Sequence, residues 1–242
     1  MAGLAGISVD YLTRLEQGRA TSPSVQVVEA LVRALRVSGA ERDLLFRLAG
    51  HATPGLEAVS SHITPSVQRL LDRLVHTPVA VYDATWTLIV ANASYDALMG
   101  PTTSWRGIER NSVWRHLVGP GSRAVHTPEQ QHEFEAGLVA DLRLTAARYP
   151  NDQRLKQLTR DLAAQSPRFE MLWQSGAPQS HQDFGRNKVI DHPDVGHITL
   201  DCDTMIVAAN DLRIMIYTAE PDTDDAERLA LAVVLGTQSL VD

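Results

Sequence analysis

The sequence lacks the features that mark many enzymes and membrane proteins. Its 242 residues hold one cysteine, Cys202, which excludes an internal disulfide framework and fits a reducing cytoplasm. No apolar run approaches the roughly 18 residues that a membrane span needs. The N-terminus has no basic leader followed by an apolar core. We therefore expect a cytoplasmic protein without a membrane segment or a signal peptide.

Catalytic motifs are also missing. There is no GxSxG elbow, no phosphate-binding P-loop and no dinucleotide GxGxxG, and Gly119-Pro120-Gly121 has the composition of a turn. Asp201 and Asp203 would share one face of a strand, either as an acid pair or as a solvated edge. No set of residues supports catalysis, and we expect neither an enzyme nor a cofactor.

Metal ligands are present without a metal-binding pattern. The candidates in the C-terminal part are His181, Asp183, His192, His197 and Cys202. Their spacing includes neither a CxxC pair nor an HExxH helix. We expect no metal site, with His192 ordering a turn before Pro193 and Cys202 packed as a thiol.

The N-terminal stretch Gly3–Arg19 has the pattern of half a helix-turn-helix. Gly6 suits a sharp turn, Ser8 can cap the following helix, and Gly18 can end it. An inward stripe is expected from Val9, Leu12 and Leu15. The outward residues are expected to be Asp10, Thr13, Arg14 and Gln17.

The run DYLTRLEQGR, which ends in Glu16, Gly18 and Arg19, resembles the xenobiotic-response-element (λ-repressor-like) family of bacterial DNA-binding domains. The resemblance implies that a recognition helix meets the major groove and that Arg19 contacts phosphate. The implied groove contacts are Ser8, Val9, Asp10, Thr13 and Arg14. An αα-hairpin of another helical protein is the alternative.

In that family the packing alanine is the fifth residue of the first motif helix, a place that Ala2 takes here. We therefore expect the family's first helix to be missing. Leu4, Leu12 and Leu31 would then lack cover, which predicts self-association.

The first 51 residues contain six arginines and five acidic residues, a net charge of +1, whereas the remainder carries −8. A DNA-binding protein usually presents a basic face, because phosphate contacts release counterions. Charge alone therefore argues slightly against nucleic-acid binding.

Two further helices are expected before residue 50. Ser24 would cap the first, whose buried stripe is predicted to be Val25, Val28, Leu31, Val32 and Leu35. Gly39 would end it, and a helix at 41–49 would bury Leu44, Leu45 and Leu48. We predict a helix-turn-helix domain at 1–51, a linker at 52–63 and a second domain at 64–242.

The second domain has the element order of an α+β fold. Thr64-Pro65 begins a helix, short strands follow at 79–82 and 87–91, and Asn92 or Ser94 caps the next helix. Helices are expected from Thr127, from Asn151 or Asp152, and from Ser166. The C-terminal strands are expected at 189–190, 197–200, 205–208 and 213–218, with turns at 201–203 and 210–211 and a last helix at 226–235. This order is that of a PAS-like antiparallel sheet with inserted helices.

Several segments of this domain resemble the MmyB-like transcription regulators. They are Ser166-Pro-Arg-Phe-Glu-Met-Leu-Trp173, His192-Pro-Asp-Val-Gly196, Tyr217-Thr-Ala-Glu-Pro221, Arg110-Asn-Ser-Val-Trp114 and the region of Asn92. The resemblance implies an N-terminal repressor-type domain joined to a PAS-like sensor for a small apolar ligand, with long-chain fatty acids the leading idea.

A pocket for such a ligand needs an apolar lining with a few polar groups. The expected lining is Tyr95, Trp114, Leu138, Leu142 and Trp173. Arg115 or Arg143 would pair with a carboxylate head. Ordinary core packing is the alternative for each tryptophan.

These observations predict a cytoplasmic one-component transcription regulator, in which a homodimer binds double-stranded DNA under the control of an apolar ligand. The alternative is a truncated ligand-sensing or dimerisation module that does not hold DNA.

Overall fold

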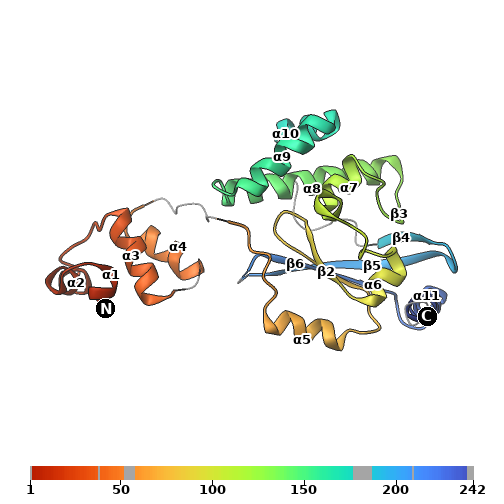
Figure 1. Cartoon of the computed structure of the whole chain (residues 1–242), viewed down its shortest axis with the longest axis horizontal. Helices are drawn as coiled ribbons and strands as arrows, with labels where there is room; N and C mark the ends of the chain where they lie inside the picture. Colours follow the sequence, from red (N-terminus) through yellow and green to blue (C-terminus); the bar gives the residue numbers. More distant parts are fainter. Residues whose placement is uncertain (1, 38, 52–57, 177–186, 209, 239–242) are drawn as a thin grey trace. The chain divides into compact units, whose positions relative to one another are not determined.

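The chain divides into two compact units, which we call the N-terminal unit (Met1–Gly55) and the C-terminal unit (Leu56–Asp242). The computed structural model describes residues 2–37, 39–51, 58–176, 187–208 and 210–238. Helices make up the described part of the first unit, and a sheet with helices makes up the second (Figure 1). The predicted α+β fold class is confirmed.

The N-terminal unit contains the helices α1 (Ala2–Ala5), α2 (Val9–Glu16), α3 (Val25–Leu35) and α4 (Gly39–Leu48). Ser8 accepts a hydrogen bond from the Tyr11 amide at 3.1 Å, and Ser24 accepts one from the Val27 amide at 3.4 Å. Both predicted N-caps are confirmed, because a serine at this position satisfies a backbone N–H that the helix leaves unpaired. Gly6 has a φ of +64°, which allows the turn between α1 and α2.

The buried apolar residues among those described in this unit are Ala2, Ala5, Val28 and Phe46. Phe46 is fully buried, whereas Leu44 is 48% and Leu48 is 72% exposed. The predicted inner face of α4 is therefore wrong for Leu44 and Leu48, because the packing turns Phe46 inward, while Leu45 is half-buried. The predicted end of α3 at Gly39 is also wrong, since α3 ends at Leu35, the left-handed Arg36 (φ +51°) follows, and α4 begins at Gly39.

The predicted stripe of α3 is only partly buried. Val28 is 2% exposed, but Val25 and Leu35 at the two ends are each 41% exposed. Leu4 is 80% exposed, as expected, while Leu12 and Leu31 are half-buried.

The C-terminal unit is built on a six-stranded antiparallel sheet of order β2-β1-β6-β5-β4-β3. The strands are β1 (Val79–Tyr82), β2 (Leu88–Ala91), β3 (Ala124–Val125), β4 (Asn187–His192), β5 (Gly196–Val207) and β6 (Leu212–Thr218).

The predicted turn at Asp201–Asp203 is wrong. These residues lie inside β5, where Cys202 pairs with Tyr217 of β6 and faces the core at 8% exposure. All three residues pair with β6 and Asp201 also pairs with Asn187 of β4, and this pairing overrides the turn preference of aspartate. The predicted turn before β6 is present, with Asp211 in a left-handed conformation at φ +54°.

Eight helical segments accompany the sheet in the described part of this unit. They are α5 (Pro65–Arg73), α6 (Ala93–Met99), η1 (Gly107–Arg110), α7 (Ser112–Leu117), α8 (Pro128–Arg148), α9 (Gln153–Gln165), α10 (Pro167–Ser175) and α11 (Asp224–Gln238). The predicted caps Thr64, Asn92, Thr127, Asp152 and Ser166 each accept the expected backbone hydrogen bond. The sequence prediction misses η1, α7 and the short strand β3.

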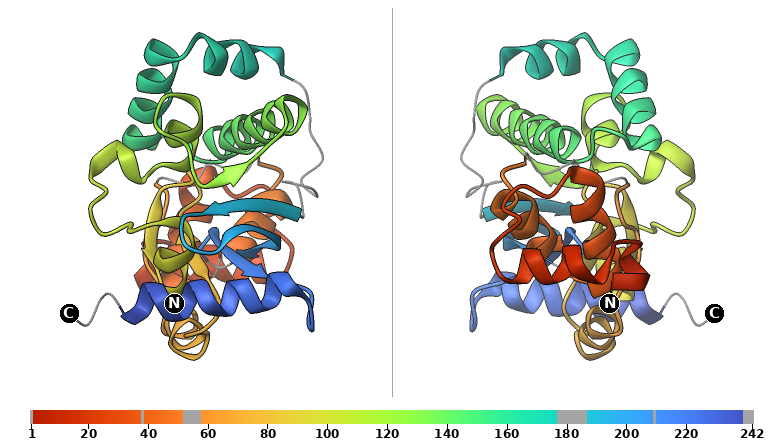
Figure 2. Two further views of the ribbon diagram at one scale, coloured as in Figure 1. Left: turned by 90° about the vertical axis from the view of Figure 1, so that its right-hand side faces the viewer. Right: turned by 90° about the vertical axis from the view of Figure 1, so that its left-hand side faces the viewer.

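The two faces of the sheet pack against different helices. Val67 and Leu71 of α5 cover Val79, Val81 and other residues on one face. The larger core lies on the opposite face, where α8 contributes the buried side chains Phe134, Leu138, Val139 and Leu142. In Figures 1 and 2 the strands lie between α8 on one side and α5 and α11 on the other.

A buried ion pair joins α8 to the sheet. Arg213 of β6 donates to Oδ2 of Asp141 at 2.7 and 3.0 Å, and both residues are under 9% exposed. The same oxygen accepts a hydrogen bond from Nε1 of Trp86 at 2.7 Å. Trp86 lies in the turn between β1 and β2 with a φ of +63°, so one carboxylate holds three elements together.

Within the described part of the chain, no helix is both long and apolar enough to cross a membrane.

Candidate DNA-binding and ligand-binding sites

The first candidate site is the outer face of α2. The residues exposed on this segment are Ser8, Val9, Asp10, Thr13, Arg14, Glu16, Gln17, Gly18 and Arg19. All six predicted DNA contacts are therefore accessible. The predicted inward position of Val9 is wrong, because its side chain is 72% exposed, while Leu12 and Leu15 are half-buried against the unit.

Two cations on this face are available to a partner. Arg14 and Arg19 make no side-chain hydrogen bond or ion pair with the described residues, although their backbones join at 2.8 Å from the Arg19 amide to the Arg14 carbonyl. Thr13 differs, because its hydroxyl donates to the Val9 carbonyl at 3.0 Å. The hydroxyl oxygen of Thr13 can therefore accept a further hydrogen bond but has no second proton to donate. Gly18 has a φ of +67°, which lets the chain turn away just after α2. Arg19 is the next residue and therefore lies close to the end of this helix.

The second candidate site is a cavity of about 30 Å³ inside the C-terminal unit, between the sheet and α6, α7 and α8. Its lining residues are Tyr82, Tyr95, Met99, Ser112, His116, Ser122, Ala124, His126, Phe134, Lys188, Met215 and Tyr217. Tyr95 is the one predicted ligand contact among them. The volume has room for one or two water molecules.

Three tyrosines form one wall of this cavity. The hydroxyls of Tyr82 and Tyr95 are 3.0 Å apart and hydrogen-bonded, and the rings of Tyr95 and Tyr217 have centroids 6.0 Å apart. Burial raises the pKa of Tyr95 to about 12 and also raises the pKa values of Tyr82 and Tyr217. All three are therefore neutral phenols that keep their protons near neutral pH.

Two imidazoles and a lysine of the lining lie around Phe134. His116 meets the Phe134 ring edge-on at 4.7 Å, His126 stacks on it at 5.3 Å, and the Lys188 ammonium lies 4.5 Å from its centroid. Burial, together with the Lys188 charge, lowers the pKa of His116 to about 3. Burial also lowers the pKa of His126, against the hydrogen bond that its ring donates to Oε1 of Gln131. Both rings are neutral at pH 7.

The other six predicted ligand contacts do not line this cavity or the two described below. Leu138 and Leu142 are buried in the core, at 1% and 0% exposure. The polar or aromatic residues among the six contact other groups of the protein. Arg143 donates to the Trp173 carbonyl at 3.2 Å, Trp114 donates to Oε1 of Gln165 at 3.4 Å, and Arg115 lies 3.8 Å above the Trp105 ring.

Sequence reasoning missed His116, Lys188 and the two other tyrosines of the cavity. A signal for Lys188 was present, since it stands in a run whose alternate positions, Ile190 and His192, also face inward. Because lysine side chains are mostly exposed to solvent, an inward position was not expected for Lys188.

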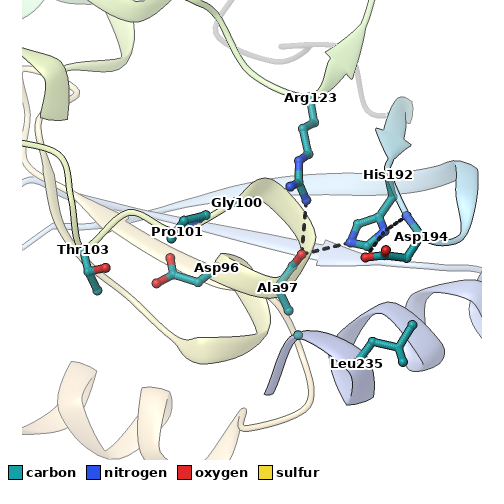
Figure 3. A pocket seen from close by; sticks show the side chains of 10 residues that line it. Asp96, Ala97, Gly100, Pro101, Thr103, Arg123, His192, Asp194 and Leu235 are labelled. Atoms are coloured by element: carbon teal, nitrogen blue, oxygen red, sulfur yellow. Dashed lines mark hydrogen bonds and ion pairs between the residues drawn. The ribbon is translucent and has the colours of Figure 1, made fainter. Parts of the chain in front are cut away.

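A second cavity, of about 500 Å³, lies between α6, β4 and the end of α11. Figure 3 shows Arg123 and His192 converging on the carbonyl of Ala97 near the end of α6. His192 also accepts a hydrogen bond from the Asp194 amide at 3.2 Å, which agrees with its expected role in a turn. These polar groups satisfy helix carbonyls, so the arrangement stabilises the end of α6.

A third cavity, of about 630 Å³, lies beside the β1–β2 turn, η1 and α9. Its lining mixes apolar side chains such as Leu88 and Leu158 with carboxylates such as Asp83 and Asp161. Burial raises the pKa of Asp83, against hydrogen bonds from Thr85 and Thr87.

The metal candidates do not come together in the described residues, which contain no group of three or more possible ligands. His181 and Asp183 lie outside the described residues. Cys202 is a buried free thiol.

Helices with an exposed recognition-type face in one unit, and an α+β fold with an internal cavity in the other, fit the class of proteins that has a DNA-binding part and a ligand-binding part. The comparisons with known proteins agree with this class. The model of the MmyB-like transcription regulator ligand binding domain matches residues 63–232, and that of a helix-turn-helix domain matches residues 1–45. The chain belongs to the MmyB-like transcription regulators. No curated protein is similar enough to this chain to be matched.

Proposed function

We propose that this chain is a one-component regulator that binds specific DNA through α2 and is controlled by an apolar ligand, such as a fatty acid, in its C-terminal unit. Ser8, Val9, Asp10, Thr13 and Arg14 would meet base edges in the major groove, and Arg19 would contact phosphate. The observation that carries this proposal is the exposed face of α2, where Arg14 and Arg19 have no side-chain partner among the described residues, in a chain whose family regulates transcription.

The chemistry of that face suits base recognition. A guanidinium with no partner among the residues that the structure describes, such as that of Arg14, can donate two hydrogen bonds to guanine. An apolar side chain left in water, as Val9 is at 72% exposure, suits contact with a thymine methyl group.

The ligand part of the proposal is supported by the interior cavity between the sheet and α8. Phe134, Met99 and Met215 supply apolar walls, and methionine side chains adapt their shape readily. A ligand that binds one conformation of this unit better than another would shift the population of DNA-binding chains. We extend the proposal to a cytoplasmic homodimer, because two recognition helices one DNA turn apart would read both halves of a palindromic site.

The proposal is tested by selecting DNA from a random pool with the full chain and then measuring affinity at several salt concentrations. Binding is expected to weaken as salt rises, because phosphate contacts release counterions. Arg14→Ala should cost about 1–3 kcal/mol of specific binding if Arg14 reads a guanine. Arg47→Ala, an exposed arginine on α4, is the matched control and should leave sequence preference unchanged.

A second candidate is a ligand-binding module that does not hold DNA. It is favoured by the small buried core of the N-terminal unit and by the net charge of only +1 on residues 1–51. Failure to select any DNA, together with ligand binding by the same preparation, would support this candidate instead.

A further inference from the structure

The turn between β1 and β2 is organised around the carboxylate of Asp83. Its Oδ1 accepts hydrogen bonds from the Thr85 amide at 2.8 Å, the Thr85 hydroxyl at 2.6 Å and the Thr87 amide at 3.1 Å. Because the Thr85 hydroxyl gives its one proton to Asp83, it accepts from the Thr87 hydroxyl at 2.8 Å, and Asn111 donates to Thr87 at 3.0 Å. This chain of donors runs toward one oxygen of Asp83 and favours the ionised carboxylate.

The other oxygen of Asp83, Oδ2, has no hydrogen-bond or ion-pair partner among the described residues. It is open to solvent, because no fully buried side-chain oxygen in the described part of the chain lacks a partner. Burial raises the pKa of Asp83 despite the bonds to Oδ1, so its negative charge is poorly compensated. Arg213 is the cation that acts on this carboxylate, but it already donates to Asp141 at 2.7 Å.

Asp83 lines the cavity of about 630 Å³ beside the β1–β2 turn, η1 and α9. This volume lies within the range of small-molecule sites, which combine an apolar lining with a few polar groups. The cavity shares no lining residue with the interior cavity of about 30 Å³. Its apolar side chains are Val59, Leu88, Ile89, Ile108, Leu155 and Leu158.

The other charged side chains of the described lining leave Asp83 as the group that a ligand can pair with. Both oxygens of Asp152 accept hydrogen bonds from backbone amides, at 2.7 and 2.8 Å. Arg110 donates to two backbone carbonyls of β2, at 2.9 Å each. Arg154 is exposed, so solvent screens its charge. Asp161 is half-buried and uses one oxygen in a hydrogen bond at 2.7 Å, which adds a second open carboxylate oxygen.

We propose that this cavity is a second ligand site, which binds a small organic cation, a protonated primary or secondary amine with an apolar body, through Oδ2 of Asp83. An ammonium N–H donates a charge-assisted hydrogen bond to such an oxygen, while the apolar walls cover the rest of the ligand. The described lining has no aromatic ring, which disfavours a quaternary ammonium ligand, because aromatic faces recognise that group.

Such a site goes beyond the proposed function and does not depend on it. A carboxylic acid would meet Asp83 as a like charge, so the amine cavity and the interior cavity select ligands of different chemistry. Loss of amine binding would therefore leave the proposed apolar ligand and DNA binding by α2 untouched.

The test is isothermal titration of the full chain with three probes that share an indole ring and differ in charge. They are tryptamine, the neutral alcohol tryptophol and the anion indole-3-acetate. Tryptamine is expected to bind at least about tenfold more tightly than tryptophol, and indole-3-acetate no more tightly than tryptophol. The trimethylammonium derivative of tryptamine, which has no ammonium N–H to donate, should bind more weakly than tryptamine itself.

A variant assigns the effect to Asp83. Asp83→Asn keeps the size of the side chain and an oxygen for the amides of the turn, but removes the charge. Tryptamine binding should weaken by about tenfold or more, while tryptophol binding stays unchanged. Asp194→Asn, at an acid that lines the cavity of about 500 Å³, is the matched control and should bind tryptamine as the wild type does.

A measurement on the unaltered chain locates the site independently of any variant. In ¹H–¹⁵N NMR spectra, tryptamine should shift the amide signals of Thr85 and Thr87, which donate to Asp83, and leave that of Asp194 in place. No binding of tryptamine, equal binding of tryptamine and tryptophol, or an unchanged amine preference in Asp83→Asn would overturn the inference. Equal binding of the trimethylammonium derivative, or unshifted Thr85 and Thr87 signals, would overturn it as well.

Discussion

The two units of this chain are stabilised in different ways. In the N-terminal unit the described buried apolar residues are three small or medium ones, Ala2, Ala5 and Val28, with one large ring, Phe46. The C-terminal unit instead surrounds Leu138 and Leu142 with a continuous core and adds a buried ion pair. The comparison indicates that the DNA-binding part depends on few contacts, while the ligand-binding part is robust enough to hold a polar cavity within it.

The largest expected effect comes from breaking the buried ion pair of the C-terminal unit. Asp141→Ala would leave the buried Arg213 with only its longer ion pair to Asp211 at 4.0 Å, and we expect a loss of about 3–5 kcal/mol in the free energy of unfolding. Denaturant titration of the full chain measures it. Asp225→Ala, which removes the more exposed ion pair with Arg228, is the control and should cost about 1 kcal/mol or less. A similar cost for both variants would contradict the assigned role of Asp141.

The N-terminal unit should be sensitive to Phe46, the one large side chain fully buried among its described residues. Phe46→Ala is expected to remove about 3–5 kcal/mol and to unfold this unit while the C-terminal unit stays folded. Amide NMR spectra of the full chain report both units at once. Leu48→Ala, at a side chain 72% exposed, should leave both sets of signals in place. Retained dispersion of the N-terminal signals in Phe46→Ala would refute the comparison.

The cavity makes the C-terminal unit sensitive to acid. The pKa of His116 is about 3 in the folded chain, below the ordinary value near 6.5, so the unfolded chain binds a proton that the folded chain excludes. Stability from this group is complete above pH 6.5 and falls by about 1.4 kcal/mol per unit between pH 6.5 and 3.

Unfolding of the wild-type chain and of His116→Gln at pH 7 and pH 5 measures that term. The wild type should lose about 2 kcal/mol more than the variant over this interval. His197→Gln, at an exposed histidine, should follow the wild type. Parallel losses in the wild type and His116→Gln would show that His116 does not titrate as described.

The smallest effect is expected at the start of the recognition helix. Ser8→Ala removes the acceptor for the Tyr11 amide and should cost about 1 kcal/mol of N-terminal stability. Ser8→Thr keeps a hydroxyl and should recover most of it. Thermal unfolding of the N-terminal unit, followed by its NMR signals, measures the stability of both variants. Equal melting temperatures of Ser8→Ala and the wild type would show that the Ser8 cap does not stabilise α2.

Local chemistry explains which parts of the fold were predictable. Helix starts at Ser8, Thr64, Thr127 and Ser166 were found because a cap is a property of a few adjacent residues. The turn expected at Asp201–Asp203 failed because pairing with distant strands decides the conformation there. The inner face of α4 was misassigned for a similar reason, since only packing determines whether Phe46 or Leu48 turns inward.

The candidate sites divide in the same way. The residues that face outward on α2 could be predicted from their spacing in the sequence, because they lie along one short helix, with Val9 as the exception. The interior cavity could not, because it brings Tyr82, His116, Phe134 and Lys188 together from four separate elements. Arg115 and Arg143 were expected as ligand partners from their charge, whereas the structure gives both of them backbone partners.

The central claim is that ligand binding in the C-terminal unit and DNA binding by α2 are coupled. It is tested most directly by titrating DNA selected from a random pool with the full chain, with and without saturating tetradecanoate. The account predicts a change in DNA affinity of about five-fold or more, and the same factor in tetradecanoate affinity when DNA is present, because coupling is reciprocal. An identical DNA affinity in both titrations, with tetradecanoate shown to be bound, would contradict it.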